Sequence, residues 1–83
     1  MMTQTIGRKL RQFRQKKGYS QETLADRAGL HPTYIGQVER GEKNITVETL
    51  AKITTALGIP ISSVFDDVLS NPMPSAEHYP LRA

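Results

Sequence analysis

Four glycines divide the first two thirds of the chain into short segments, and this spacing constrains the fold more than any other feature. The four are Gly18, Gly29, Gly41 and Gly58. Each follows a stretch whose apolar residues recur at helical spacing. Glycine directly after a helix adopts the left-handed backbone conformation at little cost. Pro32 and Pro60 stand near the start of the next segments, where a missing N–H costs nothing. The chain is therefore predicted to form a series of short helices.

Five helices are expected, and the fold class is all-α. Their predicted ranges are 3–17, 20–28, 32–40, 46–57 and 60–69. Ser20 and Thr46 are suitable N-cap residues for the second and fourth. Because no useful length of sequence alternates with period two, no sheet is expected. Residues 1–69 form the predicted domain. Residues 70–83 hold three prolines and no helical period, and are interpreted as a flexible tail or, alternatively, a docking arm presenting Met73, Tyr79 and Leu81.

Composition limits the classes of protein that fit. Eighty-three residues correspond to one small domain, and the absence of cysteine excludes disulfides and thiolate metal sites. The start of the chain has no apolar stretch typical of a signal peptide, and no apolar run approaches the roughly 18 residues of a membrane span. A soluble cytoplasmic protein is therefore expected.

Charge is distributed unevenly along the chain. Residues 1–43 carry nine Lys/Arg and four Asp/Glu, whereas residues 44–83 carry two Lys/Arg and four Asp/Glu. Such a basic half favours a polyanionic partner, although a solvated helix face is the alternative.

The segment "GLHPTYIGQVERG", residues 29–41, is an unusual helix. Ile35 and Val38 point to one side, and the opposite side of the helical wheel is small and polar. That side holds Pro32, Thr33, Gly36, Gln37 and Arg40. Glycine inside a helix costs about 1 kcal/mol relative to alanine, so Gly36 should be offset by close approach to another surface or by contact with a neighbouring helix.

The preceding segment, "SQETLADRA", supplies an explanation for this helix. It joins residues 32–40 through the short turn "GLH", and two short helices connected in this way are typical of a helix-turn-helix. In that motif the second helix lies in the DNA major groove. Glutamine can donate to and accept from adenine, and threonine can contact a base or a thymine methyl, so Gln37 and Thr33 are suited to this position.

The stretch "SQETLADRAGLHPTYIGQVERG", residues 20–41, resembles the lambda-repressor/Cro-type (XRE) helix-turn-helix family, and the resemblance extends over residues 10–65. It is similar to small stand-alone repressors and restriction–modification controller proteins. The resemblance implies a five-helix DNA-binding domain. It implies base contacts from Pro32, Thr33 and Gln37, and phosphate contacts from Gln21, Tyr34, Arg40 and Lys43. It also implies a structural ion pair between Arg14 and Glu39. Pro32 departs from the polar residue common at this position of the family, and Gly36 is small where many members carry a longer side chain. Fewer direct base contacts give more importance to DNA shape and to Arg or Lys contacts.

Small members of this family bind palindromic sites as two-fold dimers, with half-sites about 34 Å apart. The fifth segment has more apolar residues than one face of a short helix buries, so some of them are expected to form the dimer contact. The candidates are Ile59, Ile61, Val64, Phe65, Val68 and Leu69.

No catalytic constellation, cofactor site or metal site is predicted, and neither His31 nor His78 has ligand partners at suitable spacing. The sequence therefore favours a non-enzymatic regulator of transcription, located in the cytoplasm at the nucleoid. It would be a dimeric repressor or autoregulatory controller that binds a palindromic operator through its third helix. The alternatives are an antitoxin that represses its own operon, with the tail engaging a protein partner, and a protein-interaction module.

Overall fold

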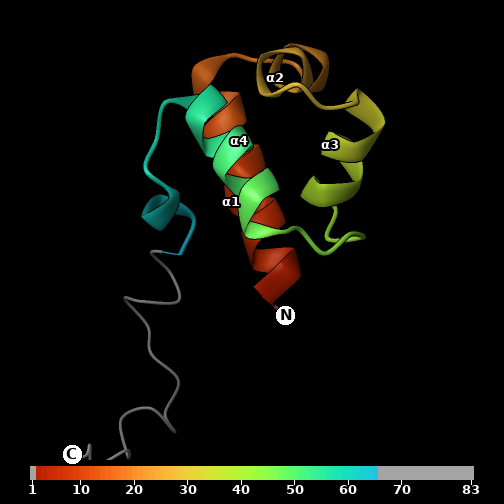
Figure 1. The fold of residues 1–83 in the computed structure, drawn as a ribbon, viewed down its shortest axis with the longest axis vertical. Coiled ribbons are helices and arrows are strands. Elements are labelled where there is room, and N and C mark those ends of the chain that lie inside the picture. Colours follow the sequence, from red (N-terminus) through yellow and green to blue (C-terminus); the bar gives the residue numbers. More distant parts are fainter. Residues whose placement is uncertain (1, 66–83) are drawn as a thin grey trace, which may run out of the picture.

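The computed structural model describes residues 2–65, and this part of the chain is helical without any strand. Its elements are α1 (Met2–Lys17), α2 (Gln21–Ala28), α3 (Pro32–Glu39), α4 (Val47–Leu57) and the 3-10 helix η1 (Ile61–Phe65). Helices α1 and α4 pack against each other at the centre, with α2 and α3 on one side and η1 on the other (Figure 1). The all-helical prediction agrees with this arrangement.

The helix ends are formed as the sequence predicts. The Ser20 hydroxyl accepts the backbone N–H of Thr23 at 2.9 Å, and the Thr46 hydroxyl accepts that of Thr49 at 3.1 Å. The four glycines that separate the segments all have φ between 70° and 76°. A side chain is rarely found in this left-handed conformation, so glycine lets the chain reverse directly after each helix.

The fifth element differs from the prediction of an α-helix over residues 60–69. The structure has a five-residue 3-10 helix, in which the N–H of Ser63 donates to the carbonyl of Pro60 at 3.0 Å. Serine competes for backbone hydrogen bonds and is a poor helix former, so Ser62 and Ser63 favour a short 3-10 turn over a sustained α-helix. Residues 66–69 and the predicted tail, 70–83, lie outside the described residues.

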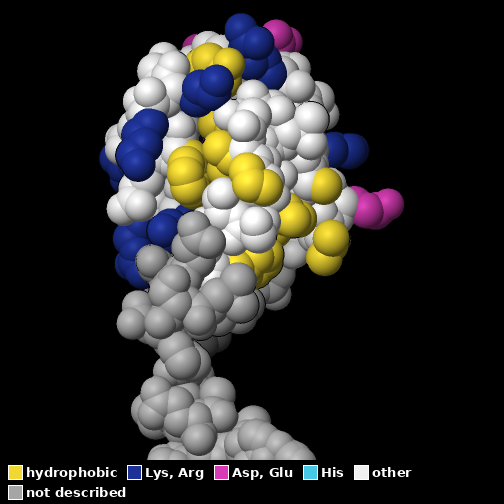
Figure 2. Space-filling view, turned by 90° about the vertical axis from the view of Figure 1, so that its left-hand side faces the viewer, with side chains coloured by type: hydrophobic (Ala, Val, Ile, Leu, Met, Phe, Trp, Pro, Cys, Tyr) yellow, Lys and Arg dark blue, Asp and Glu magenta, His cyan; other side chains and the backbone are white. Residues whose placement is uncertain are grey.

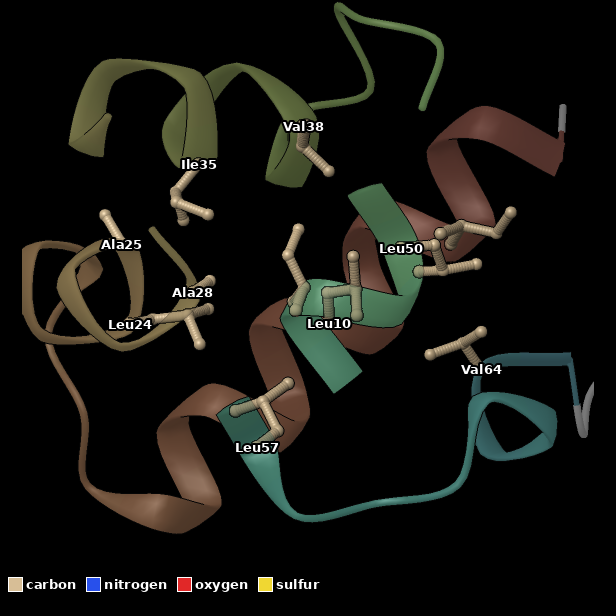
Figure 3. Packing of buried hydrophobic residues seen from close by; sticks show 11 residues of the cluster. Leu10, Leu24, Ala25, Ala28, Ile35, Val38, Leu50, Leu57 and Val64 are labelled. Carbon is tan, nitrogen blue, oxygen red and sulfur yellow. The ribbon is translucent and has the colours of Figure 1, made fainter. Parts of the chain in front are cut away.

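Every element contributes to one hydrophobic core. Its largest fully buried side chains are Leu10, Leu24, Ile35, Val38, Ile53, Leu57 and Val64. Figure 3 shows labelled residues of this core, among them Leu10, Leu57 and Val64, converging from different helices on a shared interior. Val64 was predicted to belong to a dimer interface. Because its side chain has 0% exposure within this one chain, it presents no surface to a second subunit, and that part of the prediction is wrong.

The apolar residues of α4 are not all buried. Leu50, Ile53 and Leu57 face the core, but Val47 is 75% exposed and Ala51 is also exposed. Figure 2 shows the side of the molecule that carries η1, where hydrophobic side chains gather across the middle and basic side chains gather along one edge. Within residues 2–65, no helix combines the length and the apolar character that crossing a bilayer requires.

Candidate nucleic-acid interface

Helices α2 and α3 are joined by a tight turn of defined geometry. Gly29 ends α2 in the left-handed conformation, and the N–H of Leu30 donates to the carbonyl of Ala25 at 2.8 Å. His31 then caps α3, because its Nδ1 accepts the N–H of Thr33 at 3.1 Å. The imidazole of His31 therefore acts as the N-cap of the helix that follows the turn. The two helices are in contact, and α3 also packs on α1.

Helix α3 has one buried face and one accessible face. Ile35 and Val38 are each only 1% exposed and pack into the core. On the accessible side Thr33 is exposed and Gln37 is partly exposed, and their four-residue spacing places them one turn apart on the same face. Pro32, at the start of the helix, is also partly exposed. The three predicted base-contacting residues are therefore accessible, with Thr33 and Gln37 on a common face.

Gly36 does not lie on this accessible face, contrary to the helical-wheel interpretation. It is buried, and a Cβ built on it would lie 3.1 Å from Nη1 of Arg40 and 3.4 Å from Oε1 of Gln21. Of the two explanations for a glycine here, close contact with a neighbouring helix is the one that the structure supports. The physical reason is that the first residue of α2 and the C-cap residue of α3 both fold across this position.

An ion pair ties α1 to the end of α3. Nε and Nη2 of Arg14 donate to the two carboxylate oxygens of Glu39, at 2.6 Å and 3.0 Å. Nη1 of Arg14 donates to the carbonyl of Tyr19 at 2.8 Å, and Nε2 of Gln21 donates to Glu39 at 3.1 Å. The side chains of Arg14 and Glu39 are 11% and 3% exposed. The predicted Arg14–Glu39 pair is thus present, and it also orients Gln21, the predicted phosphate contact.

The remaining predicted phosphate contacts differ in their surroundings. Arg40 is exposed and forms a second ion pair, with Nε and Nη2 donating to the carboxylate of Glu42 at 2.8 Å and 3.3 Å. The hydrogen bond to Arg40 lowers the pKa of the Glu42 carboxyl, and the same bond raises the pKa of Arg40. Lys43 is exposed on the loop that follows α3. Tyr34 is partly buried, with its ring packed against the core.

Gly7 is a structural determinant of this surface that the sequence interpretation missed. It is buried in the middle of α1, where a Cβ would overlap the carbonyl oxygen of Val38 and lie 2.9 Å from that of Glu39. Only glycine allows α1 to approach the last turn of α3 so closely. The available signal was a glycine inside a helical pattern, away from any predicted turn.

Comparison with known proteins agrees with this geometry. A helix-turn-helix family model matches residues 10–64. Control protein C.BamHI of Bacillus amyloliquefaciens is 43% identical over 62 residues, which are 74% of this chain and 76% of that protein. The crystal structure of the restriction–modification controller protein C.AhdI from Aeromonas hydrophila superposes with a TM-score of 0.75 at 43% identity. That superposition covers 76% of this chain and 96% of C.AhdI.

A third similar protein has been solved with DNA. The controller protein C.Esp1396I, as a tetramer in complex with its natural 35 base-pair operator, has a TM-score of 0.76 at 27% identity. The superposition covers 84% of this chain and 92% of that one.

Proposed function

Because the chain belongs to the XRE-type helix-turn-helix family of DNA-binding transcription regulators, we propose that it binds a palindromic operator as a dimer and inserts α3 into the major groove. The observation that carries this proposal is the accessible face of α3, which presents Thr33 and Gln37. Gln21, the first residue of α2, is held to the end of α3 by its hydrogen bond to Glu39. Threonine and glutamine match the hydrogen-bonding groups on base edges. The strongly basic first half of the chain supports the same orientation towards DNA.

The phosphate contacts in this proposal lie around the ends of α2 and α3. Gln21 uses one amide N–H for Glu39, which leaves its other N–H for a phosphate oxygen. Arg40 and Lys43 supply positive charge, and Tyr34 supplies a hydroxyl. Phosphate contacts set the position of a protein on the duplex, whereas base contacts select the sequence. Pro32, next to Thr33, completes the proposed base-facing set.

The dimer contact in this proposal lies on the side of η1, away from α3 (Figure 1). Ile61 is 36% exposed, and Ile59 and Phe65 are partly exposed there. Val68 and Leu69 belong to the proposed interface but lie outside the described residues. A regulator of this kind would act in the cytoplasm at the nucleoid, as a repressor or an autoregulatory controller. The operator-bound tetramer of C.Esp1396I supports oligomeric DNA binding.

The test of this function is selection of bound duplexes from a random pool at near-physiological salt. Enrichment of a palindrome whose half-site centres lie about one helical turn apart supports a dimeric sequence reader. No enrichment, from a folded helical protein, contradicts it. That result would favour an antitoxin or a protein-interaction module, whose partner would then be sought at η1 and at the tail.

We expect Gln37→Ala to weaken binding to the selected operator by about 1–3 kcal/mol and to relax preference at one base position in each half-site. The reason is that the substitution removes the side-chain amide of Gln37, whose N–H donor and carbonyl acceptor would contact one base edge. Repeating the selection with the variant measures both effects. Gln12→Ala, on the exposed surface of α1, is the matched control. An unchanged preferred sequence with Gln37→Ala would show that α3 does not read the bases through this residue.

We expect Ile61→Glu to weaken dimerisation at least about 100-fold, because a carboxylate would be buried without a partner in an apolar contact. Light scattering at tens of micromolar would then report a monomer, where the unmodified protein is a dimer. Val47→Glu is a suitable control, since Val47 is a still more exposed apolar residue on a different element. Equal effects of the two substitutions would argue against an interface at η1.

A further inference from the structure

We propose that Glu42 is a specificity-determining residue whose carboxylate holds the Arg40 guanidinium in the free protein and competes with DNA phosphate for it. This inference rests on the proposed function, in which Arg40 contacts the DNA backbone. In this inference Glu42 opposes binding to DNA of arbitrary sequence. Glu42 releases Arg40 only where a DNA phosphate is held firmly beside the guanidinium.

In the ion pair, the carboxylate of Glu42 binds Arg40 in the way that a DNA phosphate would. Nε and Nη2 of Arg40 donate to separate oxygens of Glu42, at 2.8 Å and 3.3 Å. This two-pronged arrangement is the one that arginine also uses with phosphate, so the two anions compete for the same pair of N–H groups. A glutamate carboxyl is charged at neutral pH, and this hydrogen bond lowers the pKa of Glu42 further.

The backbone holds Glu42 in place as a competitor. Arg40 is the C-cap of α3, and Gly41, with φ of 76°, reverses the chain directly after it. The N–H of Glu42 then donates to the carbonyl of Gln37 at 2.9 Å, and that of Gly41 donates to Val38 at 3.0 Å. These two bonds fasten residue 42 to the last turn of α3. The carboxylate is therefore present at a high effective concentration next to Arg40.

The Nη1 end of the guanidinium lies near Gly36, against which the side chain of Gln21, a proposed phosphate contact, is also placed. Nη1 of Arg40 and Oε1 of Gln21 lie 3.1 Å and 3.4 Å from the point that a Cβ of Gly36 would occupy. The side chains of Arg40 and Gln21 thus both lie against Gly36. A phosphate held by Gln21 is consequently within reach of Arg40, and it would draw the guanidinium away from Glu42.

This arrangement affects operator and random DNA unequally. The side chains of Arg40 and Glu42 are 56% and 53% exposed, so their ion pair is weak and can be displaced. On random DNA the phosphates are contacted loosely and in many registers, and the carboxylate opposes each contact. On the operator, base contacts from α3 hold one phosphate beside Gln21 and Arg40. The competition therefore reduces non-specific binding more than specific binding.

The experiment measures duplex binding by fluorescence anisotropy over a series of salt concentrations, with the selected operator and a random duplex. We expect Glu42→Gln to tighten binding to the random duplex about two- to fivefold, the range of an exposed ion pair. The salt dependence should steepen by about 0.9 in the log–log slope, which corresponds to one additional phosphate contact. The gain on the operator should be smaller, so the ratio of the two affinities should fall.

Two further comparisons separate this mechanism from a general effect of charge. Glu48→Gln removes the same charge from an exposed position on α4 and should reproduce neither change. In an Arg40→Gln background, Glu42→Gln should no longer tighten binding, because no guanidinium remains to be released. An equal gain in that background, or from Glu48→Gln, would overturn the proposal and leave the proposed function intact. Failure of the unmodified protein to bind any duplex would instead overturn the proposed function, and this inference with it.

Discussion

Replacing Arg14 by alanine is expected to lower the free energy of unfolding by about 3–5 kcal/mol, the cost of leaving a buried charge without its partner. Glu39 is only 3% exposed, and within residues 2–65 Arg14 supplies two of the three hydrogen bonds that its carboxylate accepts from side chains. The carbonyl of Tyr19 would also lose its donor. Urea denaturation followed by the helical circular dichroism signal measures the loss.

Two comparisons make this prediction specific. Arg11→Ala removes an exposed arginine from the same helix and should change stability by no more than about 0.5 kcal/mol. The double substitution Arg14→Met with Glu39→Leu should be less destabilising than Arg14→Ala, because no unpaired charge remains. If Arg14→Ala were as mild as Arg11→Ala, the ion pair would not be what holds α1 to the end of α3.

Replacing Gly7 by alanine is expected to destabilise the protein by about 1–3 kcal/mol or more, although alanine is the better helix former by about 1 kcal/mol. The added Cβ would overlap the carbonyl oxygen of Val38, and a backbone atom cannot move aside as the tip of a side chain can. The end of α3 must shift away from α1, which also displaces Gln37 and Arg40. Thermal unfolding should show a Tm lower by roughly 4–8 °C for each kcal/mol lost.

The same variant should bind the operator more weakly than its loss of stability accounts for. Binding is therefore measured at a temperature where the protein remains folded, and Gln12→Ala, an exposed position on α1, serves as the control. An ordinary glycine inside a helix gains stability on substitution by alanine. If Gly7→Ala raised the Tm, the close approach of α1 to α3 would be contradicted, and with it the role of Gly7 in positioning α3.

Local features of the fold could be predicted because they depend on residues close together in the chain. Glycine after a helix, serine or threonine before one and apolar residues at helical spacing act within a few positions. They located α1 to α4 and the turn between α2 and α3. The accessibility of Thr33 and Gln37 followed from the same periodicity, since Ile35 and Val38 had to face inwards.

The burial of some residues depended on contacts between segments far apart in the sequence. Periodicity within one helix carries no information about such contacts. Gly36 belonged to the outer face on a helical wheel, but it is covered by Gln21 and Arg40. The number of apolar residues in the fifth segment makes Val64 a candidate for the dimer contact, whereas in the structure it completes this chain's own core.

The sequence by itself determined the positions of α1 to α4, the turn of the motif and the exposure of Thr33 and Gln37 on α3. Only the tertiary structure decided how α3 is held, because its supports come from distant residues: the close approach at Gly7 and the ion pair from Arg14 to Glu39. It also decided that Arg40 pairs with Glu42 and that the side chains of Arg40 and Gln21 both lie against Gly36. The physical reason is that helix formation is a local equilibrium of the backbone, whereas steric fit and charge pairing depend on the relative placement of whole helices.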